Sequence, residues 1–395
     1  MKCNWTTKKL SEIANINPKE SIGKGVVAKK VPMDKLQPFC RDIPEFVLEE
    51  YKGGTKFRNG DTIMARITPC LENGKIAKVS VLSDDEVGFG STEYIVFRAI
   101  DGVSDAEFLY YLICSPLVRN PAIKSMVGSS GRQRVQTDVV ASLNIEIPPF
   151  EEQRKIGGLL KALDDKIELN NQINNNLEEQ LSALFVNMFG HSIDSLDNSD
   201  IKLGDLIESV DNRGKTPPLS DEPTDYPIID VRALSGNSRI IDYTNCTKYV
   251  SKETYNNWFR SGHPKEYDIL ISTVGSLAEM KIFLGTIGCI AQNVVGFRTK
   301  GISPLYLYQY LNYIKNDLVA YNIGSVQPSI KVTHIIKHSI YVASKEDIEI
   351  FDNIARNITK KIFANCQENE ALKQMRDTLL PKLMSGELDV SNIKI

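Results

Sequence analysis

The chain has 395 residues, of which 42% are apolar, 25% charged and 8% aromatic, and its formal net charge is -3. This composition excludes a disordered, collagen-like or disulfide-scaffold protein, and the length predicts two to four domains of roughly 100–200 residues. No run of about 18 apolar residues is present, so we expect no membrane-spanning helix. The seven cysteines form no Cys-x-x-Cys pair, and we expect reduced thiols in a cytoplasmic protein.

Two segments have the pattern of mixed α/β domains with many loops. Short β-rich runs closed by glycine- and proline-containing turns predict strands at 61–67, 93–97, 268–274 and 294–297. Amphipathic runs predict helices at 108–112 and 305–314. Runs rich in glycine, serine and proline predict loops at 128–134 and 211–218.

Two long helices follow these domains, one after each. In both, apolar residues alternate at spacings of three and four, which is the a/d pattern of a coiled coil. The predicted seam consists of Leu163, Ile167, Asn170, Asn174, Leu177 and Leu184 in the first helix and Ile358, Ile362, Asn365, Asn369, Leu372 and Leu379 in the second. Asparagines at seam positions lower stability but fix register, and we expect the two helices to pair with each other, antiparallel.

Aligning Leu163 with Ile358 superimposes the two helices, with Leu181 facing Arg376 as the one mismatch in character. The domains align as well, once loop insertions are allowed for, and this alignment places Gln133 opposite Gln327. The sequence therefore predicts a tandem duplication. The expected divisions are a first domain at 1–150, a first helix at 151–190, a second domain at 191–345, and a second helix with a tail at 346–395.

Charge is distributed unevenly: the domains are slightly basic and the helical segments acidic. Loops that contain Arg, Gln, Asn and Ser are typical of base-edge contacts in DNA, because Arg pairs with guanine and Gln or Asn with adenine. The candidate DNA contacts are Arg66, Arg132, Gln133 and Arg134 in the first domain and Asn212, Arg213, Lys215, Ser272, Thr273, Ser325 and Gln327 in the second.

Catalytic motifs are largely missing. No phosphate-binding loop occurs, and His334 and His338 have no acidic partner in a metal-binding pattern. One alternative remains open: Asp268, Glu279 and Lys281 have the arrangement of a magnesium-dependent nuclease, in which two carboxylates hold the metal.

Three further motifs carry a resemblance to a known family. They are IPPFEEQRKI at 147–156, GSVQPSI at 324–330 and LLPKLMSGEL at 379–388. Together they resemble the specificity subunits of type I restriction-modification systems, over essentially the whole chain. Two departures are Lys345 to Ile348, which replaces the Pro…Glu-Gln pattern at the second junction, and Arg134, which stands where the family has proline.

The resemblance implies an α+β fold with two target-recognition domains related by pseudo-two-fold symmetry and separated by two antiparallel helices. It implies a non-catalytic subunit that binds a two-part double-stranded DNA target. Two methyltransferase subunits and restriction-translocase subunits are the implied partners. Adenosylmethionine, ATP and Mg²⁺ are expected on those partners, because methyl transfer needs a flipped base and a cofactor pocket that this sequence lacks. A coiled-coil scaffold that does not bind DNA remains a second alternative.

Overall fold

The computed structural model describes residues 4–129, 131–195, 200–285 and 287–390. The chain forms two compact units: Met1–Leu169 with Asn369–Ile395 is unit 1, and Asn170–Glu368 is unit 2. Each long helix contributes residues to both units, so the units cut across the four segments expected from the sequence. Cys40, Cys70, Cys114, Cys246 and Cys289 are free thiols, and Cys3 lies outside the described residues.

Unit 1 is built on an antiparallel sheet in the order β2-β9-β6-β7. Its strands are β2 (Ala14–Ile16), β6 (Thr62–Ala65), β7 (Ile76–Lys78) and β9 (Tyr94–Ala99). Successive residues of β6 enter different cores: Ile63 packs on one face, and Met64 packs on the other, where α2 (Ala106–Cys114) lies. Because both faces are covered, all four residues of β6 are buried, and buried and exposed residues do not alternate along it.

A second sheet of unit 1, in the order β4-β3-β8-β5, has no counterpart among the strands predicted from the sequence. Its strands are β3 (Val27–Val31), β4 (Val47–Glu50), β5 (Thr55–Phe57) and β8 (Gly88–Gly90). A separate two-stranded ladder pairs β1 (Thr6–Lys9) with β10 (Asn144–Ile147). The remaining short helices are α1 (Leu10–Ile13), α3 (Pro116–Lys124) and α4 (Thr137–Ala141).

Unit 2 repeats the first sheet in the order β11-β14-β12-β13. The strands are β11 (Ile207–Val210), β12 (Ile269–Ser272), β13 (Met280–Ile282) and β14 (Val294–Thr299), and α9 (Pro304–Tyr313) occupies the place of α2. The short helices are α6 (His191–Asp194), α7 (Leu203–Leu206), α8 (Lys252–Asn257), α10 (Lys315–Ala320) and α11 (Val332–Ile335). The four strands and two helices predicted in the domains are all present.

One ion pair recurs in the two sheets and supports the duplication. The carboxylate of Asp61, at the start of β6, accepts bidentate hydrogen bonds from Arg98 at 2.7 and 2.8 Å. Asp268, at the start of β12, accepts the same pair of bonds from Arg298 at 3.1 and 2.7 Å. Both aspartates are buried. A buried carboxylate needs such a partner, so each pair fixes the start of the central strand.

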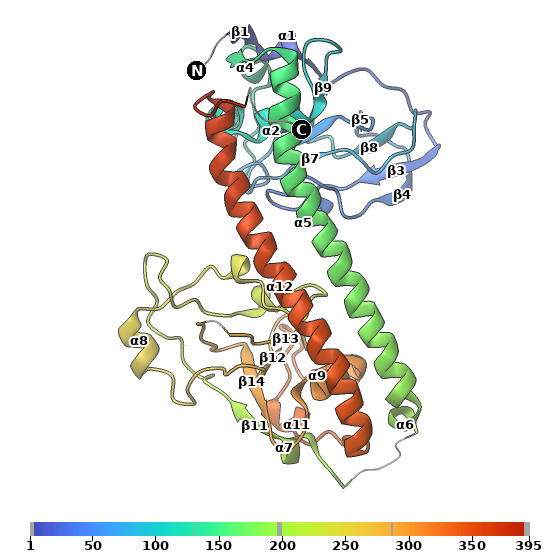
Figure 1. The fold of residues 1–395 in the computed structure, drawn as a ribbon, viewed down its shortest axis with the longest axis vertical. Helices are drawn as coiled ribbons and strands as arrows, with labels where there is room; N and C mark the ends of the chain where they lie inside the picture. The colour runs from blue at the N-terminus through green and yellow to red at the C-terminus, as the bar shows by residue number, and fades with distance from the viewer. Residues whose placement is uncertain (1–3, 130, 196–199, 286, 391–395) are drawn as a thin grey trace. The chain divides into compact units, whose positions relative to one another are not determined.

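The long helices are α5 (Phe150–Phe185) and α12 (Lys345–Met384), and Figure 1 shows each as one continuous helix. They run antiparallel: Asp164 contacts Arg376 in unit 1, and Asn174 contacts Asn365 in unit 2. None of the twelve predicted seam residues is exposed. The mismatched pair also has an explanation, because Leu181 is buried in the apolar core of unit 2 whereas Arg376 forms a buried ion pair in unit 1.

The two motifs at the helix ends have structural roles in unit 1. Gln153 is buried at the start of α5, where it donates to the carbonyls of Val103 and Pro148 and accepts from the amide of Asp105. These bonds fix α5 to the beginning of α2. At the end of α12, Leu383 and Met384 are buried in the same unit's core.

Candidate nucleic-acid interface

The predicted contact residues of unit 1 gather where β6 ends. The amide of Val135 donates to the carbonyl of Arg66 at 2.8 Å, and the amide of Thr68 donates to the carbonyl of Gln133 at 3.0 Å. The Thr68 hydroxyl accepts from the Gln133 amide at 3.0 Å. These bonds hold residues 133–135 against the residues that follow β6. We call 66–68, 127–129 and 131–135 the first loop cluster, and it contains Arg66, Arg132, Gln133 and Arg134.

The four side chains of the first loop cluster differ in exposure. Arg132 and Arg134 are exposed, whereas Gln133 and Arg66 are half-buried. The guanidinium of Arg66 reaches the Val135 carbonyl at 3.5 Å only, and its buried Nε has no hydrogen-bond partner among the described residues. Arg134 forms a bidentate ion pair with Glu93, whose pKa is lowered by the hydrogen bonds from that guanidinium. Two cationic side chains of the cluster are thus accessible to a ligand.

Unit 2 has a matching arrangement at the end of β12. The amide of Ile330 donates to the carbonyl of Thr273 at 2.9 Å, and the amide of Gly275 donates to the carbonyl of Pro328 at 3.0 Å. The side-chain oxygen of Asn322 accepts from the amides of Gly324 and Ser329 and so closes loop 322–330. We call 273–275 and 322–330 the second loop cluster. Ser325 and Gln327 are exposed at its tip.

The hydrogen bonds correct one sequence alignment. Val135 binds Arg66 as Ile330 binds Thr273, and the isolated bridges Ile67–Arg134 and Val274–Ser329 follow the same register. Gln133 therefore corresponds to Pro328, and the predicted match of Gln133 with Gln327 is wrong by one residue. The backbone hydrogen bonds show which loop residues are equivalent in the two units. The identity of the side chains alone does not show this.

Three predicted contacts of unit 2 are corrected, because their side chains are buried and already hydrogen-bonded. The amide nitrogen of Asn212 donates to the Gly262 carbonyl at 2.9 Å, and its oxygen accepts from the Ser261 amide at 2.9 Å. Ser272 and Thr273 are fully buried, and their hydroxyls donate to backbone carbonyls. A buried polar group forms such bonds because it has lost water. The structure therefore gives Asn212, Ser272 and Thr273 a role in shaping the loops, with no exposed surface for a ligand.

Loop 211–215 carries two further predicted contacts of unit 2. Lys215 is exposed. Arg213 is half-buried, donates to both carboxylate oxygens of Asp211 at 2.9 and 2.7 Å, and reaches the Thr273 hydroxyl at 3.5 Å. This last contact places loop 211–215 beside the second loop cluster. The sequence did not identify Asp211 and Glu93 as part of the site. A carboxylate alone disfavours DNA binding, and the sequence does not show that each of these carboxylates is paired with an arginine.

The three residues of the nuclease alternative do not converge on a metal site. Asp268 is bound to Arg298, and Glu279 forms an ion pair with Lys315 at 3.0 Å. Lys281 donates to the carbonyls of Gly236 and Ser238. Within the described residues, no group of three or more His, Cys, Asp or Glu side chains is arranged to hold a metal ion. These residues have structural partners, and the geometry does not favour a nuclease.

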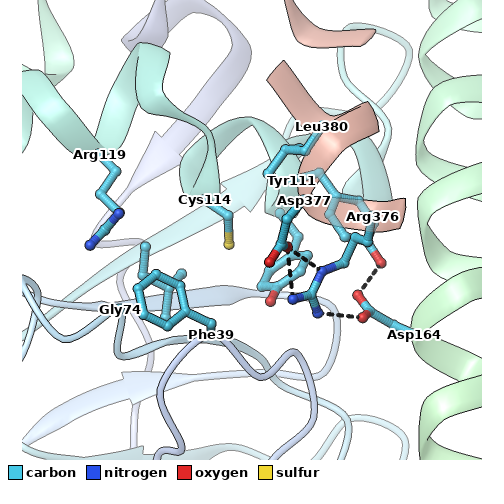
Figure 2. Close-up of a pocket in the computed structure, with 11 residues that line it drawn as sticks. Phe39, Gly74, Tyr111, Cys114, Arg119, Asp164, Arg376, Asp377 and Leu380 are labelled. Atoms are coloured by element: carbon cyan, nitrogen blue, oxygen red, sulfur yellow. Dashed lines mark hydrogen bonds and ion pairs between the residues drawn. The ribbon is translucent and has the colours of Figure 1, made fainter. Parts of the chain in front are cut away.

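A small cavity of about 50 Å³ in unit 1 belongs to the helix pair and not to a ligand site (Figure 2). Beside it, the guanidinium of Arg376 lies between Asp164, at 2.7 Å, and Asp377, at 2.9 Å. The Tyr111 hydroxyl donates to Asp164 at 2.6 Å, and burial together with that carboxylate raises the pKa of Tyr111. This network joins α12, α5 and α2 and leaves little room for a bound molecule.

Two stretches of the chain, residues 2–179 and 196–373, match the family model described as the type I restriction modification DNA specificity domain. These matches span most of the sequence, so the chain belongs to this family. Of the helices that the structure describes, none combines the length and the hydrophobicity needed to cross a membrane.

Individual relatives agree with this assignment. The HindI specificity subunit of Haemophilus influenzae is 25% identical, and the match covers 84% of this chain and 87% of that protein. The EcoAI specificity subunit of Escherichia coli is 34% identical over 157 residues, which are 38% of this chain and only 26% of that protein. The solved S subunit of a type I system from M. genitalium has the same fold, with a TM-score of 0.58 and 15% identity over 96% of each chain.

Proposed function

We propose that this chain is the DNA-recognition subunit of a type I restriction-modification complex, in which each unit binds one half of a two-part DNA target. The observation that carries the proposal is the recurrence of one loop arrangement at the same end of the same central strand in both units. Two similar binding surfaces on one chain match a target with two separate parts. Membership of the specificity-domain family supports the same conclusion.

The residues proposed to contact DNA are the exposed and half-buried ones among the predicted contacts of the two clusters and the neighbouring loop. They are Arg66, Arg132, Gln133 and Arg134 in unit 1 and Arg213, Lys215, Ser325 and Gln327 in unit 2. Arginine and lysine supply phosphate contacts and guanine recognition, and glutamine suits adenine. The chain itself is proposed to be non-catalytic, with two methyltransferase subunits and restriction-translocase subunits as partners. Adenosylmethionine, ATP and Mg²⁺ would then be bound by those partners.

A scaffold that does not bind DNA is the second candidate, and salt dependence separates the two. We would measure the affinity of the assembled complex for duplex DNA at several salt concentrations. Each phosphate contact contributes about -0.9 to the slope of log affinity against log salt, so DNA contact predicts a steep decline. Arg132→Gln and Lys215→Gln should each reduce the slope by about 1. Lys345→Gln, whose lysine is 91% exposed at the start of α12, is the charge-matched control and should leave the slope unchanged. A flat salt response of the unmodified complex favours the scaffold.

A further inference from the structure

In both units, an arginine near the loop cluster is held by a carboxylate along the same edge of its guanidinium. Arg134 donates from Nε to both oxygens of Glu93 at 2.9 Å and from Nη2 at 2.6 Å. Arg213 donates from Nε and Nη2 to the two oxygens of Asp211 at 2.9 and 2.7 Å. Arg134 and Arg213 do not occupy equivalent positions in the two units. The similar pairing is therefore not a consequence of the duplication.

The chemistry of this pairing leaves a defined part of each arginine free. A guanidinium carries five N–H groups, and the carboxylate occupies the edge formed by Nε and Nη2. Each terminal nitrogen carries two hydrogens, so the edge formed by Nη1 and Nη2 still has two parallel donors beside the carboxylate. In Arg213, Nη1 also makes a long contact of 3.5 Å with the Thr273 hydroxyl. That pattern is the one required to bind O6 and N7 of a guanine in the major groove. The arginine side chains are accessible, at 48% exposure for Arg134 and 27% for Arg213.

Stability alone is a weak explanation for these ion pairs. Both pairs are partly open to solvent, and ion pairs at the surface contribute little to folding, typically about 0–1 kcal/mol. Near DNA, a carboxylate also repels phosphate, so its presence lowers affinity unless it serves another purpose. The hydrogen bonds from Arg134 lower the pKa of Glu93 and so favour its charged form. Burial opposes ionisation of Asp211, but the hydrogen bonds from Arg213 outweigh it and lower the pKa of that carboxyl too.

We propose that Glu93 and Asp211 are positioning residues for sequence specificity, and that they orient Arg134 and Arg213 so that each recognises a guanine, one in each half of the DNA target. This inference rests on the proposed function above. A long arginine side chain loses rotamer freedom when it binds, and a carboxylate that fixes it beforehand lowers this cost. The carboxylate also restricts the arginine to one orientation, in which a wrong base leaves its donors unpaired.

The test is to map methylated positions in the genome of cells that express the assembled complex, for the unmodified chain and for E93Q and D211N. Glutamine and asparagine keep the size of the side chain but offer one strong acceptor instead of two. We expect E93Q to weaken the preference for guanine at one position of one half-target by about ten-fold, with the other half unchanged. D211N should do the same in the other half. Each variant is therefore the control for the other. A further control is E49Q, which alters the ion pair of Glu49 in β4 with Lys30 in β3 and should change neither half.

Further variants separate the outcomes. R134K keeps the positive charge but removes the paired donors of the guanidinium. It should therefore weaken the preference for the same guanine as E93Q does and leave the salt dependence of DNA binding unchanged. If E93Q and D211N instead reduce methylation evenly at all sites, with the motif unchanged, the arginines contact phosphate and the inference is overturned. If the unmodified complex assembles and shows no two-part motif, the proposed function itself is wrong.

Discussion

Asn365 donates a hydrogen bond from its side-chain nitrogen to the side-chain oxygen of Asn174 at 2.7 Å, and both residues are buried between α5 and α12 in unit 2. The heptad pattern identified the seam, and the structure shows which asparagines meet. A polar pair in an apolar seam favours one register, because a shift separates these two amides.

The Asn174–Asn365 pair predicts an asymmetry between single and double variants. Asn365→Leu alone should lower the free energy of unfolding by about 1–3 kcal/mol, because the amide of Asn174 stays buried with a lost partner. Asn174→Leu combined with Asn365→Leu should recover this loss or exceed the stability of the unmodified chain. Chemical denaturation of the three proteins measures the effect. A double variant that is less stable than the Asn365→Leu protein would mean that the two amides do not depend on each other.

The ion pair of Arg376 with Asp164 gives a second prediction. In the alignment of the two helices, these residues correspond to Leu181 and Thr359 of unit 2, which cannot form an ion pair. Arg376→Leu, which introduces the residue found at 181, should destabilise the protein by about 3–5 kcal/mol because it leaves the buried Asp164 without its cation. Adding Asp164→Thr, the residue found at 359, should recover most of that loss. Thermal unfolding of both variants checks this. A double variant as unstable as R376L would show that the charge on Asp164 is not what destabilises the single variant.

Lys281 predicts a pH dependence of stability. Its side chain is buried, and burial lowers its pKa from 10.5 to about 8. Between these values the unfolded chain holds a proton that the folded chain releases, so this group makes the protein more stable as pH rises from about 8 to 10.5. Below pH 8 the cost of the buried charge is present in full. Compared with Lys281→Met, the unmodified chain should gain about 3 kcal/mol across this range.

Denaturation of both proteins at intervals between pH 7.5 and 10.5 provides the measurement. The comparison cancels the titration of cysteines and tyrosines, which the two proteins share. Parallel stability curves would contradict the lowered pKa of Lys281.

Gln327 predicts an effect confined to one half of the DNA target. Gln327→Ala removes an exposed amide of the second loop cluster and should weaken methylation of that half by about 1–3 kcal/mol if the amide makes a bidentate contact with adenine. Val326→Ala is the matched control, because Val326 is 98% exposed in the same loop and has no hydrogen-bonding side chain. The kinetics of methylation of duplexes altered in either half provide the comparison. Equal rates for Q327A and the unmodified chain on all duplexes would remove Gln327 from the interface.

Local periodicity accounts for the elements that the sequence predicted correctly. The strands at β6, β9, β12 and β14 and the helices α2 and α9 follow from spacings between neighbouring residues. The sheet formed by β3, β4, β5 and β8 was not predicted, because its strands are short and β4 is exposed along its whole length. Such strands form because their backbones pair with neighbouring strands, and their sequences show no apolar periodicity.

The candidate site was predicted only in part, for a related reason. The loops were identified by residue type, and residue type does not distinguish a side chain that meets a ligand from one that holds the loop. Asn212 is bound by Gly262 and Ser261, about fifty residues further along the chain, and no local signal reports this contact. Glu93 and Asp211 were missed because their importance depends on the arginines they hold.

The central claim is that two separate loop clusters on one chain each recognise part of one DNA target. The most direct measurement is a map of methylated positions in a genome exposed to the complex of this chain with its methyltransferase partners. The account predicts a motif of two short specific parts separated by a spacer of fixed length and free sequence. A single uninterrupted motif, or methylation without any sequence preference, would contradict it.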